Sequence, residues 1–106
     1  ELDGVRLLEA ETVAEATACQ VEVERDGTMG VPSRYALGFG CGGTPWDKYG
    51  SLSPLETFGH GGLGSIVGWA DPGGVAMAYV TNGVRHEYEH GARVNTMADA
   101  VRTVFD

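Results

Sequence analysis

The residues with the most chemical potential lie in one short segment, Phe58-Gly-His-Gly-Gly-Leu-Gly-Ser65, where a single imidazole stands among four glycines. Glycine lets a ligand come close to the backbone and leaves peptide N–H groups free to point at an anion. The imidazole of His60 can bind a carboxylate when protonated or donate a hydrogen bond when neutral. The segment predicts a ligand-binding strand edge or, as the alternative, a glycine-rich β-turn with an incidental histidine.

A second candidate is the segment His86-Glu-Tyr-Glu-His90, which matches the pattern H-E-x-x-H. On a helix this spacing puts both imidazoles on one face as zinc ligands, with Glu87 as a general base. Glycines bracket the motif, its flanks lack the apolar period of a buried helix, and little chain remains for a third ligand. We therefore interpret it as a solvated loop or a frayed helical turn and expect no metal or other cofactor; a zinc site at His86 and His90 is the alternative.

The chain does not contain a complete serine-hydrolase site of its own. Lys48 is the only lysine, and the residue three positions before it is a proline, so no Ser-x-x-Lys pair exists. Tyr-x-Asn and Ser-x-Asn are also absent, and Ser65 lacks the G-x-S-x-G context of a nucleophile elbow. Any nucleophile that works with these residues must come from elsewhere.

Hydrophobic patterning predicts the elements that hold these segments in place. Helical periodicity indicates two helices, and apolar or alternating runs indicate five strands. The helices are expected at residues 7–20 and 92–105, the strands at 21–24, 33–40, 57–62, 65–70 and 75–81, a long loop at 41–56, a hairpin turn at 71–74 and a polar connection at 83–91. This order predicts an α+β fold with an antiparallel sheet covered by helices on one face.

Composition narrows the partners. Fifteen acidic against seven basic residues give a net charge of −8, which argues against nucleic acid, and no apolar run is long enough to span a membrane. Residues 57–84 hold a single ionised side chain, Asp71, and are expected to be interior. Cys19 and Cys41 match no zinc or redox motif, so a disulfide and free thiols both stay open. No signal peptide is visible, and scarce lysine is compatible with a salt-adapted cytoplasm, which leaves the compartment undetermined.

Residues 58–82, FGHGGLGSIVGWADPGGVAMAYVTN, resemble the C-terminal part of the serine β-lactamase-like family. That family includes class C β-lactamases, D-alanyl-D-alanine carboxypeptidases and family VIII carboxylesterases. The landmarks H-G-G, A-D-P and Y-V-T-N occur in order, and the flanks LLEAETVAEATACQ, YALGFG and ARVNTMADAVRTVF resemble the family's preceding helix, its next strand and its terminal helix. The resemblance implies that residues 1–106 are a single C-terminal segment of a β-lactamase/DD-peptidase-like fold, without the N-terminal catalytic part.

The resemblance also implies roles for four residues. In that family a Lys-Thr-Gly motif, or His-x-Gly in esterase-like members, lies on the strand that edges the active site. His60 stands at the lysine position, Gly61 at the middle and Gly62 at the small one, and the backbone N–H of Leu63 matches an oxyanion-hole donor. Loss of the lysine favours ester hydrolysis over β-lactam recognition.

The leading hypothesis is therefore the C-terminal portion of a serine hydrolase, with esterase favoured over β-lactamase. It would transfer the acyl group of a small-molecule ester or amide to water through a serine in the remainder of the same protein. The alternative is a stand-alone, non-catalytic binding domain.

Overall fold

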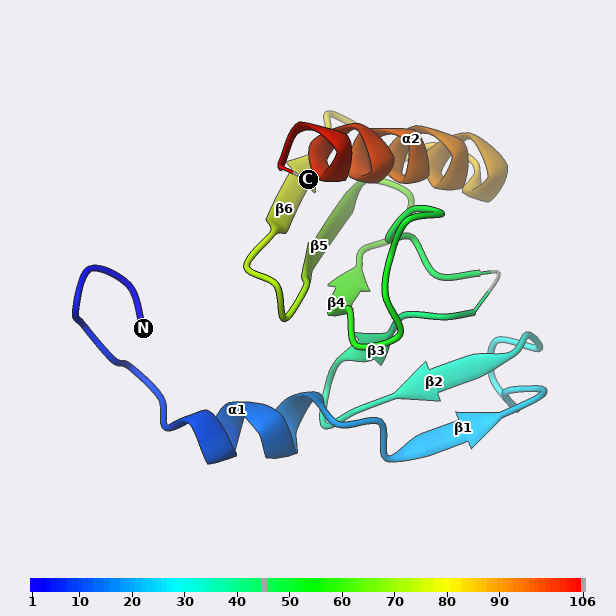
Figure 1. Cartoon of the computed structure of the whole chain (residues 1–106). Helices are drawn as coiled ribbons and strands as arrows, with labels where there is room; N and C mark the ends of the chain where they lie inside the picture. Colours follow the sequence, from blue (N-terminus) through cyan, green and yellow to red (C-terminus); the bar gives the residue numbers. More distant parts are fainter. Residues whose placement is uncertain (45, 106) are drawn as a thin grey trace.

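The computed structural model describes residues 1–44 and 46–105, in which six strands form one antiparallel sheet with two helices (Figure 1). The strands follow one another across the sheet in chain order, from β1 at one edge to β6 at the other. The elements are α1 (Ala10–Thr17), β1 (Val21–Val23), β2 (Ser33–Tyr35), β3 (Gly40–Cys41), β4 (Phe58–Gly61), β5 (Ile66–Ala70), β6 (Ala76–Val80) and α2 (Glu87–Phe105). The predicted α+β class with an antiparallel sheet is confirmed.

The longest ladder joins β4, β5 and β6, where His60 is paired with Gly68 and Gly68 with Ala78. The predicted turn at 71–74 closes the β5–β6 hairpin through a hydrogen bond of 2.8 Å from the Asp71 N–H to the Val75 carbonyl. Because side chains alternate along a strand, one face of this ladder presents Val67 and Trp69. That face is the one that α2 covers (Figure 1).

The core lies between α2 and this face. Its buried apolar members are Tyr49, Val67, Trp69, Val94 and Ala98. Tyr49 comes from the long loop between β3 and β4, which fills the space beside α2. Hydrogen bonds fasten this loop to the helix: the Gly50 N–H donates to the Asn95 side chain at 2.8 Å, and the Leu52 N–H donates to Asp99 at 3.0 Å.

The predicted and observed boundaries differ most in two places, and the helix expected at 7–20 is shorter, at Ala10–Thr17. The single strand expected at 33–40 is a hairpin of β2 and β3, because the chain turns at residues 36–39 with the Gly38 φ at +86°. The polar connection expected at 83–91 is wrong in its second half, since α2 begins at Glu87. His90 supplies the reason: its side chain is completely buried against the sheet, so residues that look polar in sequence form a packed helical turn.

The opposite face of the β4–β6 ladder is open. Ile66, Ala76, Ala78 and Val80 are exposed there, so the expectation that residues 57–84 are wholly interior is wrong for this face. At the other end of the chain α1 has no buried residue, and it lies apart from α2 (Figure 1). Within the described residues no helix is both long and apolar enough to cross a bilayer.

Candidate functional site

The glycine-rich segment lies where β4 changes from a central strand to an edge strand. β3 pairs only with Phe58 and Gly59, so His60 and Gly61 have β5 on one side and no described strand on the other. Gly59 is required at the crossing, because a Cβ there would lie 2.2 Å from the Gly68 carbonyl oxygen of β5. The motif therefore presents backbone groups at an unpaired edge.

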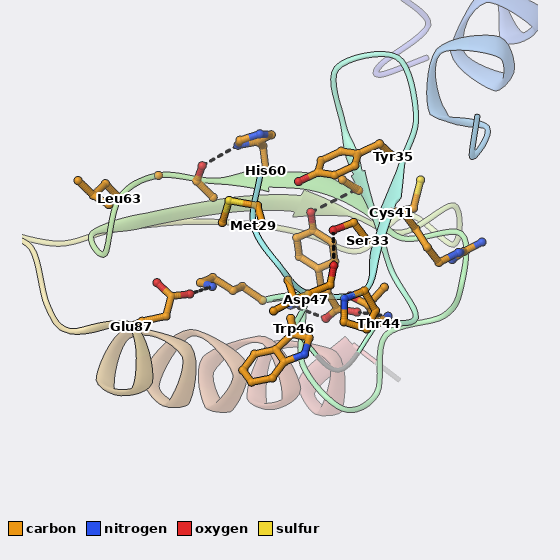
Figure 2. A pocket seen from close by; sticks show the side chains of 18 residues that line it. Met29, Ser33, Tyr35, Cys41, Thr44, Trp46, Asp47, His60, Leu63 and Glu87 are labelled. Atoms are coloured by element: carbon orange, nitrogen blue, oxygen red, sulfur yellow. Dashed lines mark hydrogen bonds and ion pairs between the residues drawn. The ribbon is translucent and has the colours of Figure 1, made fainter. Parts of the chain in front are cut away.

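This edge borders a cleft of about 340 Å³ (Figure 2). One wall consists of residues 60–63 at the end of β4, and the others come from β2, β3, the loop at 46–49 and Glu87 at the start of α2. All four site residues predicted from the sequence therefore lie together on one wall. The long loop, which the sequence marks only as rich in Gly, Pro and Ser, supplies much of the rest.

The His60 side chain is exposed, and its Nδ1 lies 2.6 Å from the carbonyl oxygen of Gly61 (Figure 2). A carbonyl can only accept, so Nδ1 carries the hydrogen in this arrangement. The neutral ring then presents an acceptor at Nε2, and only the protonated ring presents a donor there. In the neutral form the hydrogen bond that His60 donates goes to the Gly61 carbonyl, and the roles predicted for His60 toward a substrate stay predictions.

Leu63 follows the strand in a turn, with its side chain exposed. The N–H of the preceding Gly62 donates to the Ile66 carbonyl at 2.9 Å, which directs it toward β5. Leu63 itself lies outside β4, so its N–H is not part of the ladder with β5. Within residues 1–44 and 46–105 it makes no hydrogen bond.

Sequence reasoning missed Lys48 as a site residue. Its ammonium group forms an ion pair with Glu87 at the side of the cleft (Figure 2), and a Cβ at Gly61 would lie 3.7 Å from its Cδ. The hydrogen bond from Lys48 lowers the pKa of the Glu87 carboxyl, against the opposing effect of burial. The partners are 39 residues apart, so no local spacing signals the pair.

Asp47 is the other acidic group of the cleft wall. Burial raises the pKa of its carboxyl, although the backbone N–H groups of Tyr49, Gly43 and Thr44 donate to it and oppose the shift. Those bonds tie Asp47 into the loop itself. We therefore assign it to holding the loop in shape.

The H-E-x-x-H segment places its two histidines in different environments. His86 is exposed and stacks on Tyr88, with the ring centroids 5.3 Å apart, whereas His90 is fully buried. Glu87, the residue expected as a general base in the zinc alternative, is the partner of Lys48. In the described part of the chain no group of three or more His, Cys, Asp or Glu side chains is arranged to hold a metal ion.

The two cysteines are free thiols in this structure, Cys19 exposed and Cys41 buried beside the cleft. Burial raises the pKa of the Cys41 thiol, and the nearby Cys19 adds to the shift. A thiol with a raised pKa is a weak nucleophile at neutral pH. Cys41 therefore does not supply the nucleophile that the sequence lacks.

Comparison with known proteins identifies relatives of this chain. The chain is 41% identical over 83 residues to the esterase/β-lactamase LipL of Mycobacterium tuberculosis, a match that covers 77% of the chain and 18% of LipL. No protein-family model matches the chain.

Among solved structures, a penicillin-binding protein homologue from Caulobacter crescentus matches 95% of the chain and 27% of its own length, with a TM-score of 0.76 and 30% identity. A β-lactamase from Mycobacterium bovis matches with a TM-score of 0.77 and 23% identity, over 92% of the chain and 38% of that protein. A family VIII carboxylesterase shares the fold with a TM-score of 0.60 and 22% identity, over 92% of the chain and 27% of that protein. The chain thus spans well under half of each relative, and it belongs to the serine β-lactamase-like family, of whose hydrolase fold it forms one segment.

Proposed function

We propose that this chain is the C-terminal portion of a serine hydrolase and supplies the oxyanion side of its active site. The observation that supports the proposal is the position of residues 60–63, at an unpaired strand edge that faces a cleft. The Leu63 N–H, which has no hydrogen-bond partner among the described residues, is the oxyanion donor. In this proposal the remainder of the same protein supplies the serine.

The reaction is acyl transfer to water. The serine oxygen forms a bond to the carbonyl carbon of a small ester or amide, and the carbonyl oxygen takes up the negative charge that the Leu63 N–H stabilises. The alcohol or amine then leaves with a proton, and water attacks the acyl-enzyme and releases the acid. One donor of this kind contributes about 3 kcal/mol to the transition state, because it is fixed in place before charge develops.

Two features favour an ester over a β-lactam substrate. His60 replaces the lysine of the lactamase motif, and its Nδ1 is already engaged with the Gly61 carbonyl at 2.6 Å. The one lysine on the cleft wall, Lys48, is already paired with Glu87. The cleft therefore has no uncompensated lysine for the carboxylate of a β-lactam, and a neutral small ester suits it better.

The exposed face of the β4–β6 ladder suggests where the rest of the protein packs. Ile66 is 42% exposed and Val80 77% exposed on this face, beside the small side chains of Ala76 and Ala78. Apolar surface of this extent on a sheet face is usually covered in a complete domain. We propose that the remainder of the same protein covers it.

The test uses the full-length protein that contains these 106 residues. We expect Ser-x-x-Lys followed by Tyr-x-Asn upstream, and hydrolysis of a chromogenic short-chain ester at a much higher kcat/KM than that of a chromogenic cephalosporin. The His60→Lys variant should narrow this ratio by restoring a cation. A folded full-length protein that lacks those motifs and hydrolyses neither substrate would instead establish the alternative, a non-catalytic binding domain.

A further inference from the structure

The turn that follows the glycine-rich strand, residues 62–65, is held in place from the helix side. The carbonyl oxygen of Gly64 accepts two hydrogen bonds, one of 2.9 Å from Nη2 of Arg93 on α2 and one of 2.8 Å from the backbone N–H of Arg85. A Cβ at Gly64 would lie 2.4 Å from the Arg85 carbonyl oxygen, so the two segments are in close contact. The carbonyl therefore has little freedom to rotate while both donors are present.

Thr81, the residue after β6, extends the same arrangement. Its hydroxyl donates to the Ser65 carbonyl at 2.8 Å, and its own N–H donates to that carbonyl at 3.1 Å. The hydroxyl oxygen in turn accepts a hydrogen bond of 3.0 Å from Nη2 of Arg93. One guanidinium group thus fixes two consecutive carbonyl groups of the turn, Gly64 directly and Ser65 through Thr81.

His90 sets the orientation of this guanidinium. Its Nδ1 lies 3.3 Å from Nε and 3.2 Å from Nη2 of Arg93, and because arginine has no acceptor, Nδ1 must be the acceptor. The ring is fully buried, and burial lowers its pKa. The backbone of Ile66 and the charge of Glu87 oppose this shift, whereas the charges of Arg93 and Lys48 add to it. A neutral His90 with its hydrogen on Nε2 is the form that supports Arg93.

We infer that Arg93 is a positioning residue for the Leu63 N–H, acting through the carbonyl of Gly64. This inference rests on the proposed function, because it assigns a purpose to the fixed turn. The Leu63 N–H lies two peptide units before the clamped carbonyl, in a turn where Gly64 adopts a φ of +59°. Preorganisation matters here because a donor that must first be ordered stabilises the transition state less than one already in place.

The test compares arginine variants of the full-length protein. Arg93→Gln should lower kcat for a short-chain ester 10- to 100-fold while KM changes less than twofold, since a misplaced donor affects the transition state more than substrate binding. Arg93→Lys should recover part of the loss, and guanidinium ion at millimolar concentration should partly restore Arg93→Ala. Arg25→Gln is the matched control, because this exposed arginine in the loop between β1 and β2 does not line the cleft, and it should leave kcat unchanged.

A second measurement does not depend on catalysis. Amide hydrogen exchange over residues 60–66 should become faster in Arg93→Gln and stay unchanged in Arg25→Gln. Thr81→Val serves if Arg93→Gln does not fold, because it removes the hydroxyl that links Arg93 to the Ser65 carbonyl and keeps the side-chain shape. Unchanged exchange, or faster exchange with unchanged kcat, would overturn the inference. If the wild-type protein hydrolyses no ester, the proposed function fails instead, and the inference that depends on it is withdrawn.

Discussion

Two arginines of α2 reach from the helix into the sheet, and they differ in what they meet there. Arg102 has only 4% of its side chain exposed and donates two hydrogen bonds to the Asp71 carboxylate, at 2.7 and 2.9 Å, while its guanidinium stacks 3.9 Å above the Trp69 ring. Arg93, nine residues earlier, meets only uncharged acceptors, those of Gly64, Thr81 and His90. In the described part of the chain it has no carboxylate partner.

This difference in partners predicts that Arg102 matters more for the stability of the fold and Arg93 more for the function of the site. A buried charge pair in the core leaves a large penalty when one partner is removed. A guanidinium bonded to turn carbonyls near the helix start contributes less to the core and more to the shape of the adjacent segment. We therefore expect the C-terminal half of α2 to control unfolding and its N-terminal half to control turnover.

The largest effect should come from breaking the core pair. Asp71→Asn keeps the shape of the side chain but leaves Arg102 without a buried counter-charge, and it weakens the bond of 2.6 Å from the Thr57 hydroxyl. We expect a loss of about 3 kcal/mol in the free energy of unfolding, measured by urea denaturation. The kcat of the folded protein should stay within twofold of the wild type, and a loss below about 1 kcal/mol would show that the pair does not dominate this end of the helix.

The next largest effect should come from removing the proposed oxyanion donor, the backbone N–H of Leu63. Replacing the peptide N–H of Leu63 by an ester oxygen, through semisynthesis with the corresponding hydroxy acid, removes the donor and keeps the side chain. We expect kcat for a short-chain ester to fall about 100-fold, with unfolding almost unchanged because this N–H bonds to no described residue. The same replacement at Val84 is the control, and equal losses at both positions would exclude a specific oxyanion role.

The sequence predicts only part of the fold and of the candidate site. The hairpin at 71–74, the strands at 65–70 and 75–81 and the second helix follow from turn residues and periodicity, which are local signals. The grouping of residues 60–63 on one wall follows from their adjacency in sequence. These features depend on residues that are close in sequence, so a single sequence is enough to predict them.

What the sequence does not predict depends on distant partners. His90 reads as a polar residue of a loop, yet it is buried, because only the folded sheet provides its environment. Lys48 and Glu87 meet across 39 residues. The open face of β5 and β6 was expected to be buried because its apolar residues are suited to burial, and this chain alone does not cover them.

A smaller effect should appear on acidification. The pKa of His90 lies below its ordinary value of 6.5 in the folded state, mainly because of burial, so the unfolded chain binds the proton first. Stability attributed to His90 is therefore fully present above pH 6.5 and decreases as the pH falls below that value, by up to about 1.4 kcal/mol per pH unit until the folded-state pKa is reached. His90→Gln should flatten the profile between pH 6.5 and 5 in urea titrations.

The carboxylates respond in a separate window. Burial raises the pKa of Asp71, but the hydrogen bonds from Arg102 and Thr57 outweigh it and leave that pKa below the ordinary value of 3.8. Its contribution to stability is therefore present above pH 3.8 and is lost only in stronger acid.

For the His90 prediction, a stability profile of His90→Gln that matches the wild type between pH 6.5 and 5 would mean that another group titrates in that range.

The smallest effect should come from the ion pair at the side of the cleft. Glu87 is 61% exposed and Lys48 is 21% exposed, so solvent screens their attraction, and Glu87→Gln should change the free energy of unfolding by less than about 0.5 kcal/mol. Catalysis should be more sensitive than stability, because the variant leaves the Lys48 ammonium without its counter-charge beside Gly61. We expect the KM of Glu87→Gln to fall for an ester that carries a carboxylate and to stay unchanged for the neutral analogue of that ester. The double variant Lys48→Met, Glu87→Gln is the control, because without the ammonium group the KM for the carboxylate ester should not fall. An equal change in KM for both esters would show that the ion pair determines the shape of the cleft wall and not its preference for charged substrates. The N-terminal half of α2 would then affect the cleft through geometry alone.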